Sequence, residues 1–284
     1  MQLIDKEIKI IISQLKRLAI DKKGDYNRTS LKNSFTFENF CNFAFSKINI
    51  DSEIKLSSYK APDVRNCYEH FNSAWSFFFR SLKEKYMDLI YEYIKICPYC
   101  GKVPLIYFDK NKKKSRSFDF EHFFPKSIYN WLAINFYNLL PVCTFCNQKI
   151  KKDRDFYEEM KQSWWSIFHP YFGWLSVDWD VIKIENTNFH TKFKFNKTED
   201  LKSFHSKTFS LNEIYFTTQD TKNDIAFIRE SVEKLKVWQT NLPWKDIDNI
   251  KKDFFKHYVP KDETEILKFA NGKLKKDWID NLDI

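Results

Sequence analysis

The chain has 284 residues and a formal net charge of +9 at pH 7, and 18% of its residues are aromatic whereas only four are glycine. This length allows one large domain or two modest ones with a buried core. The ring content favours a compact, mainly helical protein. No apolar run reaches the roughly 18 residues of a membrane span, which excludes a transmembrane helix and predicts a soluble, cytoplasmic protein.

Apolar residues at helical spacing predict two packed helices in the first third of the chain. One stripe runs through residues 1–20, and a longer one runs through residues 63–95 in steps of three and four. We expect the second helix to pack on the first and its rings to lie in the core. The stripe residues are Leu3, Ile4, Ile8, Ile11, Ile12, Leu15 and Leu18 in the first helix, and Phe71, Trp75, Phe78, Leu82, Tyr86, Leu89 and Tyr93 in the second.

After residue 96 the pattern changes to short strands and turns. Segments 103–108 and 116–123 are predicted as strands joined by the basic loop 109–115, and residues 147–161 can form a helix of about three turns. Farther along, segments 180–184 and 189–195 alternate like a hairpin, residues 219–238 have helical spacing, and two more helices are expected after residues 244 and 262. The predicted class is α+β and mainly helical.

Four of the six cysteines form two C-x-x-C pairs, Cys97/Cys100 and Cys143/Cys146. In a chain without an export signal, such pairs favour metal ligands over disulfides. Four thiolates can surround Zn²⁺ as a tetrahedron with sulfur at about 2.3 Å, as in closed structural sites. The alternatives are a redox motif or two unrelated thiol pairs. The remaining cysteines, Cys41 and Cys67, are most simply small buried hydrophobes.

Between and beside the cysteine pairs lies an ordered set of polar residues. "FEHFFPKS" holds Glu121 and His122, "YNLLPVC" holds Asn138, and "CTFCNQK" holds Asn147. Phosphodiester hydrolysis needs an activated water and a counter-charge for the phosphate oxygens, and histidine can take a proton from water at neutral pH. A hard divalent cation prefers oxygen ligands, which carboxylate and amide groups offer.

Together with the cysteine pairs, this pattern over residues 97–152 resembles the HNH endonuclease family, whose core is the ββα-metal fold. The resemblance implies His122 as general base, Glu121 and Asn147 as ligands of a catalytic Mg²⁺ or Mn²⁺, a structural Zn²⁺, and products with a 5'-phosphate and a 3'-hydroxyl. Asn138 would bond loop backbone and so orient His122. We expect His122 at a strand end where regular pairing stops, with Asn147 facing it from the helix.

The sequence departs from the family pattern at two positions. Glu121 stands where aspartate is commoner, which adds a methylene between the backbone and the carboxylate. Ile150 stands three residues after Asn147, where the family often has a lysine, and Lys149 and Lys151 lie on either side of it.

The positive charge is concentrated around this set. Residues 97–156 hold 11 Lys/Arg against 5 Asp/Glu, a local net charge of +6. This excess favours contact with nucleic-acid phosphates, and an ordinary solvated surface is the alternative. The candidate phosphate-binding residues are Lys112, Lys113, Lys114, Arg116, Lys126, Lys149 and Lys151.

We therefore predict a metal-dependent HNH endonuclease acting on DNA, with duplex as the expected form. The long flanking segments are similar to those of HNH nucleases in bacterial anti-phage and restriction systems, such as Septu-type nuclease subunits. That similarity implies a bacterial or phage-encoded protein whose ATPase partner, if any, is another polypeptide, since the chain has no Walker-type loop.

Two alternatives stay open, a non-catalytic zinc-ordered nucleic-acid-binding or scaffold subunit and a nuclease active only with a partner. A homo-oligomer is compatible with either. The expected division is a helical region over 1–95, the nuclease core with its zinc site over 96–160, and a mixed, mainly helical region over 161–284 that can be continuous with the core.

Overall fold

The computed structural model describes the chain from residue 3 to residue 276, with gaps. Among the described residues, none of the helices combines the length and apolar character needed to span a bilayer. The hairpin predicted over 180–195 lies outside these residues, as do Cys67, Lys112 and most of the segment after residue 244. The described residues are 3–22, 41–42, 44–48, 76–110, 113–159, 169–171, 208, 219–241, 255, 258–260, 263–272 and 275–276.

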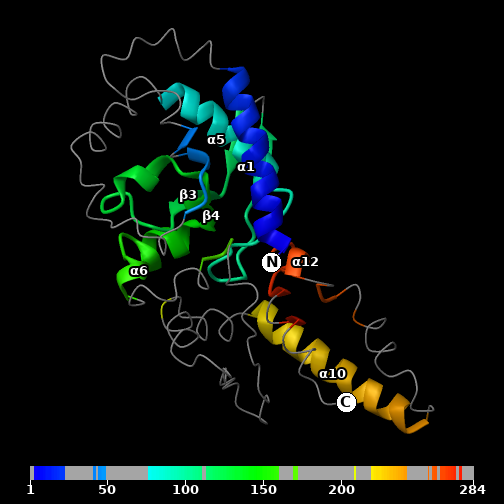
Figure 1. The fold of residues 1–284 in the computed structure, drawn as a ribbon. Helices are drawn as coiled ribbons and strands as arrows, with labels where there is room; N and C mark the ends of the chain where they lie inside the picture. The colour runs from blue at the N-terminus through cyan, green and yellow to red at the C-terminus, as the bar shows by residue number, and fades with distance from the viewer. Residues whose placement is uncertain are drawn as a thin grey trace, which may run out of the picture.

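The described part is a mixed α+β structure that is mostly helical and contains two small antiparallel hairpins (Figure 1). One hairpin pairs β1 (Tyr107–Lys110) with β2 (Lys113–Arg116), and the other pairs β3 (Phe118–His122) with β4 (Leu139–Cys143). The helical elements are α1 (Leu3–Asp21), α5 (Ser76–Ile90), η3 (Asn130–Ile134), η4 (Phe136–Asn138), the π-helix η5 (Cys146–Lys151), α6 (Phe156–Glu159), α10 (Gln219–Asn241) and α12 (Glu263–Ile266).

The two N-terminal helices pack on each other, as the apolar stripes predict. Of the helix predicted over 63–95, residues 76–90 form α5, and the part before residue 76 lies outside the described residues. The helix predicted over 219–238 is α10, and a short helix, α12, follows residue 262. The buried stripe of α1 is Ile8, Ile11, Ile12, Leu15 and Ala19.

The strand pairing differs from the expected one. The described residues of the basic segment 109–115 belong to β1 and β2 and do not form a loop. Segment 116–123 is interrupted at Ser117, whose hydroxyl accepts a hydrogen bond from the Ile106 N–H (3.0 Å). Its second half is β3, and the partner is β4, which the sequence analysis did not assign. All five residues of β4 are buried, so it lacks the alternation that marks a half-exposed strand.

The single helix expected over 147–161 is two separate pieces. In η5 the Lys152 N–H donates to the Asn147 carbonyl (2.8 Å), which is the i to i+5 bond of a π-helix. Lys152 then adopts a φ of 51°, a conformation that costs energy for a residue with a Cβ and that ends the helix. The chain becomes helical again only in α6.

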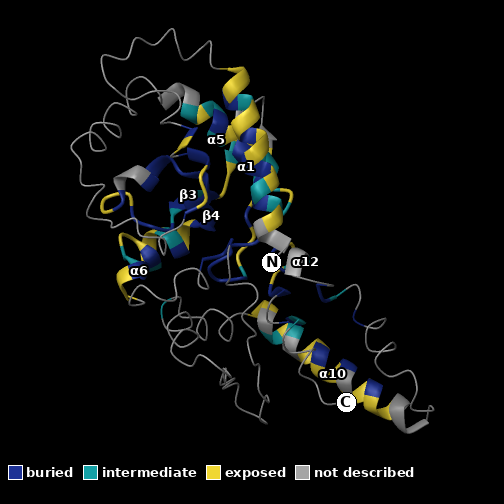
Figure 2. Ribbon diagram, in the orientation of Figure 1, coloured by how far each residue is buried: buried dark blue, intermediate teal, exposed yellow. Residues whose placement is uncertain are grey.

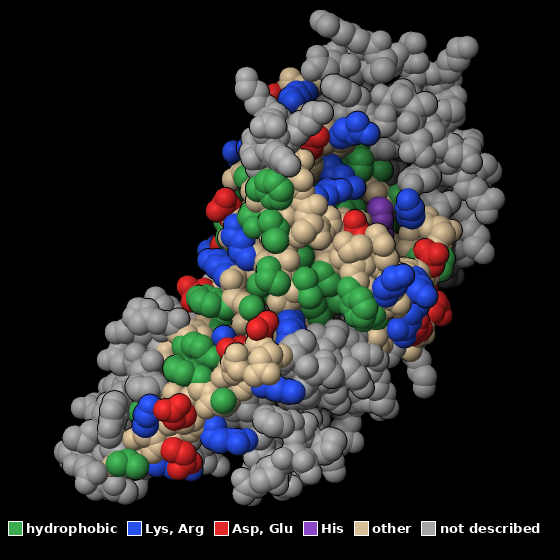
Figure 3. Space-filling view, turned by 180° about the vertical axis from the view of Figure 1, so that it is seen from behind, with side chains coloured by type: hydrophobic (Ala, Val, Ile, Leu, Met, Phe, Trp, Pro, Cys, Tyr) green, Lys and Arg blue, Asp and Glu red, His purple; other side chains and the backbone are tan. Residues whose placement is uncertain are grey.

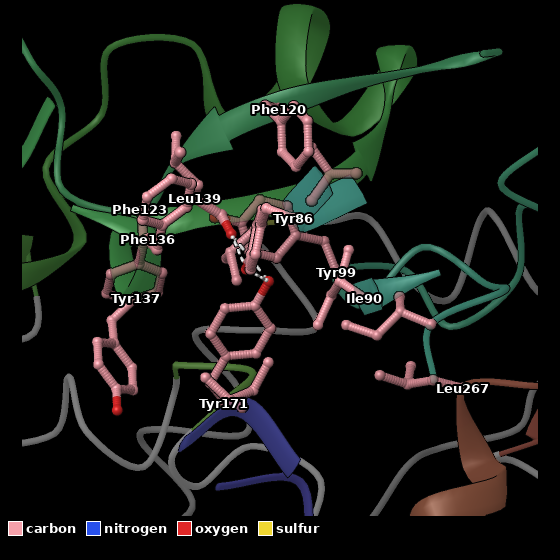
Figure 4. Packing of buried hydrophobic residues seen from close by; sticks show 14 of the residues in the cluster. Tyr86, Ile90, Tyr99, Phe120, Phe123, Phe136, Tyr137, Leu139, Tyr171 and Leu267 are labelled. Atoms are coloured by element: carbon pink, nitrogen blue, oxygen red, sulfur yellow. Dashed lines mark hydrogen bonds between the residues drawn. The ribbon is translucent and has the colours of Figure 1, made fainter. Parts of the chain in front are cut away.

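The core is centred on Tyr86 of α5, which is fully buried against the second hairpin (Figures 2 and 4). Its hydroxyl donates to the Leu139 carbonyl of β4 (3.0 Å) and lies 2.7 Å from the Tyr171 hydroxyl. The Tyr171 hydroxyl is also 2.8 Å from the Leu139 carbonyl. The Tyr86 ring packs on Phe120 and Phe136, with centroids 5.8 and 5.1 Å away. These contacts set the position of α5 relative to β3 and β4.

The C-terminal segment is joined to the chain just after α5 by backbone hydrogen bonds. The N–H groups of Lys95 and Ile96 both donate to the Leu267 carbonyl (2.8 and 2.9 Å), and the Asn271 N–H donates to the Gly101 carbonyl (3.1 Å). Asp224 of α10 accepts a hydrogen bond from the Asn271 amide (2.7 Å). Residues more than 150 positions apart are therefore in direct contact.

Replacing Tyr86 by Phe is expected to lower the free energy of unfolding by about 1 to 2 kcal/mol, because the buried hydroxyl that bonds Leu139 and Tyr171 is lost. Urea denaturation followed by circular dichroism measures the change. Tyr107→Phe is the matched control, since its hydroxyl bonds Asp88 in a half-exposed position, and it should cost less. Equal effects of the two substitutions would contradict the central role of Tyr86.

Candidate metal centre and active site

The four cysteines of the two C-x-x-C pairs come together in one buried cluster. The sulfur atoms of Cys97, Cys100, Cys143 and Cys146 all lie within 4.8 Å of one another. In the described part of the chain they are the only group of three or more His, Cys, Asp or Glu side chains placed closely enough to hold a metal ion. Four sulfur donors in a closed, buried position suit a structural Zn²⁺.

The local backbone explains how each pair presents its sulfurs. Gly101 has a φ of 64°, and its N–H donates to the Cys97 carbonyl (2.8 Å), which closes a tight turn after the first pair. A side chain with a Cβ rarely adopts this conformation, so glycine is favoured here. In the second pair, the Cys146 N–H points at the Cys143 sulfur (3.4 Å). Both turns are of the kind that places N–H groups near thiolates.

The thiols of the cluster affect one another strongly. Hydrogen bonds from the other three thiols, Cys143 first, lower the pKa of Cys100 well below its usual range. Burial, by contrast, raises the pKa of Cys97 well above it. Several thiolates cannot share so small a buried space without a counter-charge, and a divalent cation supplies one. Cys41, outside the cluster, is simply buried, as expected.

The cluster joins three elements of the predicted nuclease core. Cys97 and Cys100 follow α5, Cys143 ends β4, and Cys146 begins η5. Because Cys143 pairs with Phe118 in the hairpin register, the cluster also lies at the first residue of β3. A metal at this point would hold the strand pair and η5 in a fixed relation.

Cys143→Ser is expected to lower the free energy of unfolding on the order of 3 kcal/mol, because a metal ligand is lost. Thermal unfolding measures the effect, and elemental analysis of the purified protein should show zinc in the parent and its loss from the variant. Cys41→Ser is the control, since it changes a buried thiol outside the cluster. A parent protein without zinc would contradict the structural assignment.

His122 occupies the last paired position of β3, opposite Leu139, so it lies where regular pairing stops, as expected. Its Nε2 is 2.9 Å from the Ala133 carbonyl. A carbonyl only accepts, so Nε2 carries the proton and Nδ1 is left with the lone pair of a base. Burial is the main cause that lowers the pKa of His122 to about 4, and the charges of Lys83, Lys126 and Lys151 lower it further. The imidazole is therefore neutral at pH 7.

Asn138 holds the loop that carries the Ala133 carbonyl. Its Oδ1 accepts from the Phe124 N–H (2.8 Å), and its Nδ2 donates to the carbonyls of Phe124 (3.1 Å) and Leu132 (3.0 Å). The side chain is fully buried and bonds backbone only, which is the arrangement expected from the sequence. Asn138 thus ties the end of β3 to η3, where the partner of the His122 ring lies.

The opposite face of β3 meets η5 through two polar pairs. Asn147 donates through Nδ2 to Asp119 (3.1 Å), and Gln148 donates to the same carboxylate oxygen (3.0 Å). Lys151 lies 2.7 Å from Glu121, and its side chain is fully buried. Asp119 and Glu121 are two residues apart, so they lie on the same face of β3. Asn147 and Lys151 are four residues apart, which is slightly less than one turn of a π-helix, so they lie on the same side of η5. The two elements are therefore matched position by position.

Two expectations need correction here. Asn147 does not face His122, since its partner Asp119 lies on the other strand face and about 10 Å earlier along β3. The bond to Asp119 uses Nδ2, so the role of the Asn147 amide oxygen as a cation ligand stays a prediction. Lys151, expected at the nucleic-acid surface, is buried as the partner of Glu121. In η5 the buried lysine is Lys151, four residues after Asn147, whereas Lys149 is exposed.

The other expected phosphate contacts are distributed over the surface. Lys114, Arg116, Lys126 and Lys149 are exposed, and Lys114 forms an ion pair with Asp88 of α5. Lys113 begins β2, but its side chain, like Lys112, lies outside the described part.

No family model, curated protein or solved structure matches this chain.

Two residues near the site were missed from the sequence. Asp119 could have been found, because it precedes Glu121 by two positions and a strand places both on one face. Lys83 could not, because it lies on α5, some 40 positions before His122, next to the apolar stripe of that helix. Its charge acts on His122 only through the tertiary fold.

Lys151→Met is expected to cost about 3 to 5 kcal/mol of unfolding free energy at pH 7, because it leaves the buried Glu121 carboxylate without a partner. Burial already raises the pKa of Glu121, and Lys151 opposes that shift. In the variant the folded-state pKa rises further above the unfolded one, so stability present at low pH is lost as pH rises through the new pKa.

Chemical denaturation of this variant at several pH values above 4.5 tests the expectation. The control is Lys149→Met, which removes an exposed lysine of the same turn and should change little. The double substitution Glu121→Gln with Lys151→Met should recover much of the loss, because both buried charges are gone. If Lys151→Met alone were as stable as the parent, the buried pair would not exist in solution.

Proposed function

We propose that this protein is an HNH-type endonuclease that hydrolyses DNA phosphodiester bonds with His122 as the general base. The observation that carries the proposal is the position and the tautomer of the His122 ring. The ring is held at the strand end by the Ala133 carbonyl, the loop is fixed by Asn138, and Nδ1 is left to accept a proton. The ordered motif and the four-cysteine cluster beside β3 support the same family resemblance.

In this reaction Nδ1 of His122 takes a proton from a water molecule. The resulting hydroxide attacks phosphorus, the bond to the 3'-oxygen breaks, and that oxygen takes up a proton, which leaves a 5'-phosphate and a 3'-hydroxyl. Two of the lysines that lower the pKa of His122, Lys83 and Lys126, also attract the phosphate in this proposal. Since the bound phosphate offsets their charge, substrate binding raises the basicity of His122 when a base is needed.

The divalent cation that the resemblance implies does not fit the arrangement described. Glu121 is neutralised by Lys151, and the Asn147 amide donates to Asp119. A cation bound by Glu121 would require the ion pair with Lys151 to change, whereas the Asn147 bond uses Nδ2 and not the Oδ1 that would bind a cation. Cleavage measured with and without Mg²⁺ or Mn²⁺ tests whether the reaction depends on either ion.

The same pairs favour a second candidate, a nuclease that is active only with a partner such as an ATPase, and a non-catalytic nucleic-acid-binding or scaffold subunit is the other alternative. In a partner-activated nuclease, Glu121–Lys151 is the inactive arrangement, and the partner changes it. A role in anti-phage defence or restriction rests on the resemblance alone.

Purified protein is expected to cut plasmid or linear duplex DNA, and His122→Ala is expected to lower the rate by at least about 100-fold. The assay compares duplex DNA, single-stranded DNA and RNA, each with Mg²⁺, Mn²⁺ or EDTA. His169→Ala is not a suitable control because His169 is fully buried against Phe123, so Lys149→Met, an exposed change on η5, is used. Cleavage that persists in His122→Ala would disprove the assignment of the base, and absence of cleavage with every ion would favour the second candidate.

A further inference from the structure

Three basic side chains from separate parts of the chain gather around Phe120 and His122. Lys83 comes from α5, Arg116 ends β2, and Lys126 follows β3. The Lys83 ammonium lies 4.8 Å from the centroid of the Phe120 ring, and the Arg116 guanidinium carbon lies 5.0 Å from it. Both charges thus pack against one aromatic ring on the strand face that also carries His122.

Lys83 lies close enough to Arg116 and Lys126 for their positive charges to act on it. Burial lowers the pKa of Lys83 to about 8, and the nearby positive charges of Arg116 and Lys126 lower it further, with Asp119 as the opposing acid. Neither Lys83 nor Arg116 has a carboxylate within ion-pair distance in the described part of the chain. Cations held together in this way repel one another, and an anion placed among them removes the repulsion.

The three cations also differ in how deeply they are buried. Lys83 is half-buried, whereas Arg116 and Lys126 are exposed, so Lys83 lies at the inner side of the group. Figure 3 shows a histidine at the surface with Lys and Arg side chains around it. Of the two histidines in the described residues, His169 is fully buried and His122 is half-buried. An anion that reaches Lys83 would therefore lie beside the His122 ring.

We propose that Lys83, Arg116 and Lys126 form a phosphate-binding subsite that holds a backbone phosphate of a nucleic acid against the His122 face of β3. The subsite rests on the proposed function, because its ligand is the strand that His122 would cleave. Lys83 is the residue that distinguishes it from a general basic surface. It is the half-buried cation of the three, and the core contact of Tyr86 one helical turn away fixes its position.

Binding to DNA tests the subsite separately from cleavage. In a His122→Ala background, fluorescence anisotropy with labelled duplex and single-stranded oligonucleotides is measured over a range of salt concentrations. Lys83→Met is expected to weaken duplex binding about fivefold and to reduce the slope of log K against log salt by about 0.9, the value for one lost phosphate contact. Lys83→Arg keeps the charge and should preserve the slope.

Lys85→Met is the matched control, since Lys85 is an exposed lysine two positions later on the same helix, and it should leave affinity and slope unchanged. Thermal unfolding confirms that each variant is folded. If folded Lys83→Met binds with the parent's affinity and slope, the subsite is wrong, even if His122-dependent cleavage is observed. If the protein cuts nothing but Lys83→Met still lowers affinity and slope, the subsite stands and the nuclease proposal fails. A chain that binds neither oligonucleotide at low salt overturns the choice of ligand.

Discussion

The four-cysteine cluster is the constraint on which the rest of the described structure depends. The two cysteine pairs are separated by 42 residues along the chain. The segment between them contains the strands β1, β2 and β3 and the loop that holds His122. A metal bound by all four sulfurs would close this segment into one loop, and its binding free energy would add to the free energy of folding because the unfolded chain lacks the assembled site. The C-terminal segment also contacts the turn that holds the first cysteine pair, because the Asn271 N–H donates to the Gly101 carbonyl.

Strand β3 begins at the four-cysteine cluster and has two chemically different faces. One face meets η5 through Asp119 and Glu121, whose partners are an amide and a buried ammonium. The other carries Phe120 and His122 toward α5, where Lys83 of the proposed subsite lies. A strand separates neighbouring side chains in this way by its geometry, so Glu121 and His122 can be adjacent in sequence and still serve different surroundings.

The local features that sequence could predict are those with a short-range physical cause. Helical spacing predicted α1, α10 and the core position of Tyr86, and C-x-x-C spacing predicted which four cysteines meet. The end of β3 at His122 followed from Pro125 just beyond it. The features that the sequence did not predict depend on contacts between elements that are distant along the chain. Strand β4 is buried on all sides and has no alternation, and the π-turn that moves Lys151 inward depends on a partner, Glu121, that lies on another element. Lys83 reaches the site only because α5 packs on the hairpin.

That packing of α5 has a consequence for how the protein can vary. Tyr86 and Lys83 are three residues apart, so they lie on one side of the helix, one as a core anchor and one as a surface charge. Any change that shifts Tyr86 relative to Leu139 also moves the ammonium of Lys83 relative to His122. Packing and surface potential are therefore not independent traits in this molecule, and a conservative core replacement can alter the electric field at the histidine without touching a single charged residue.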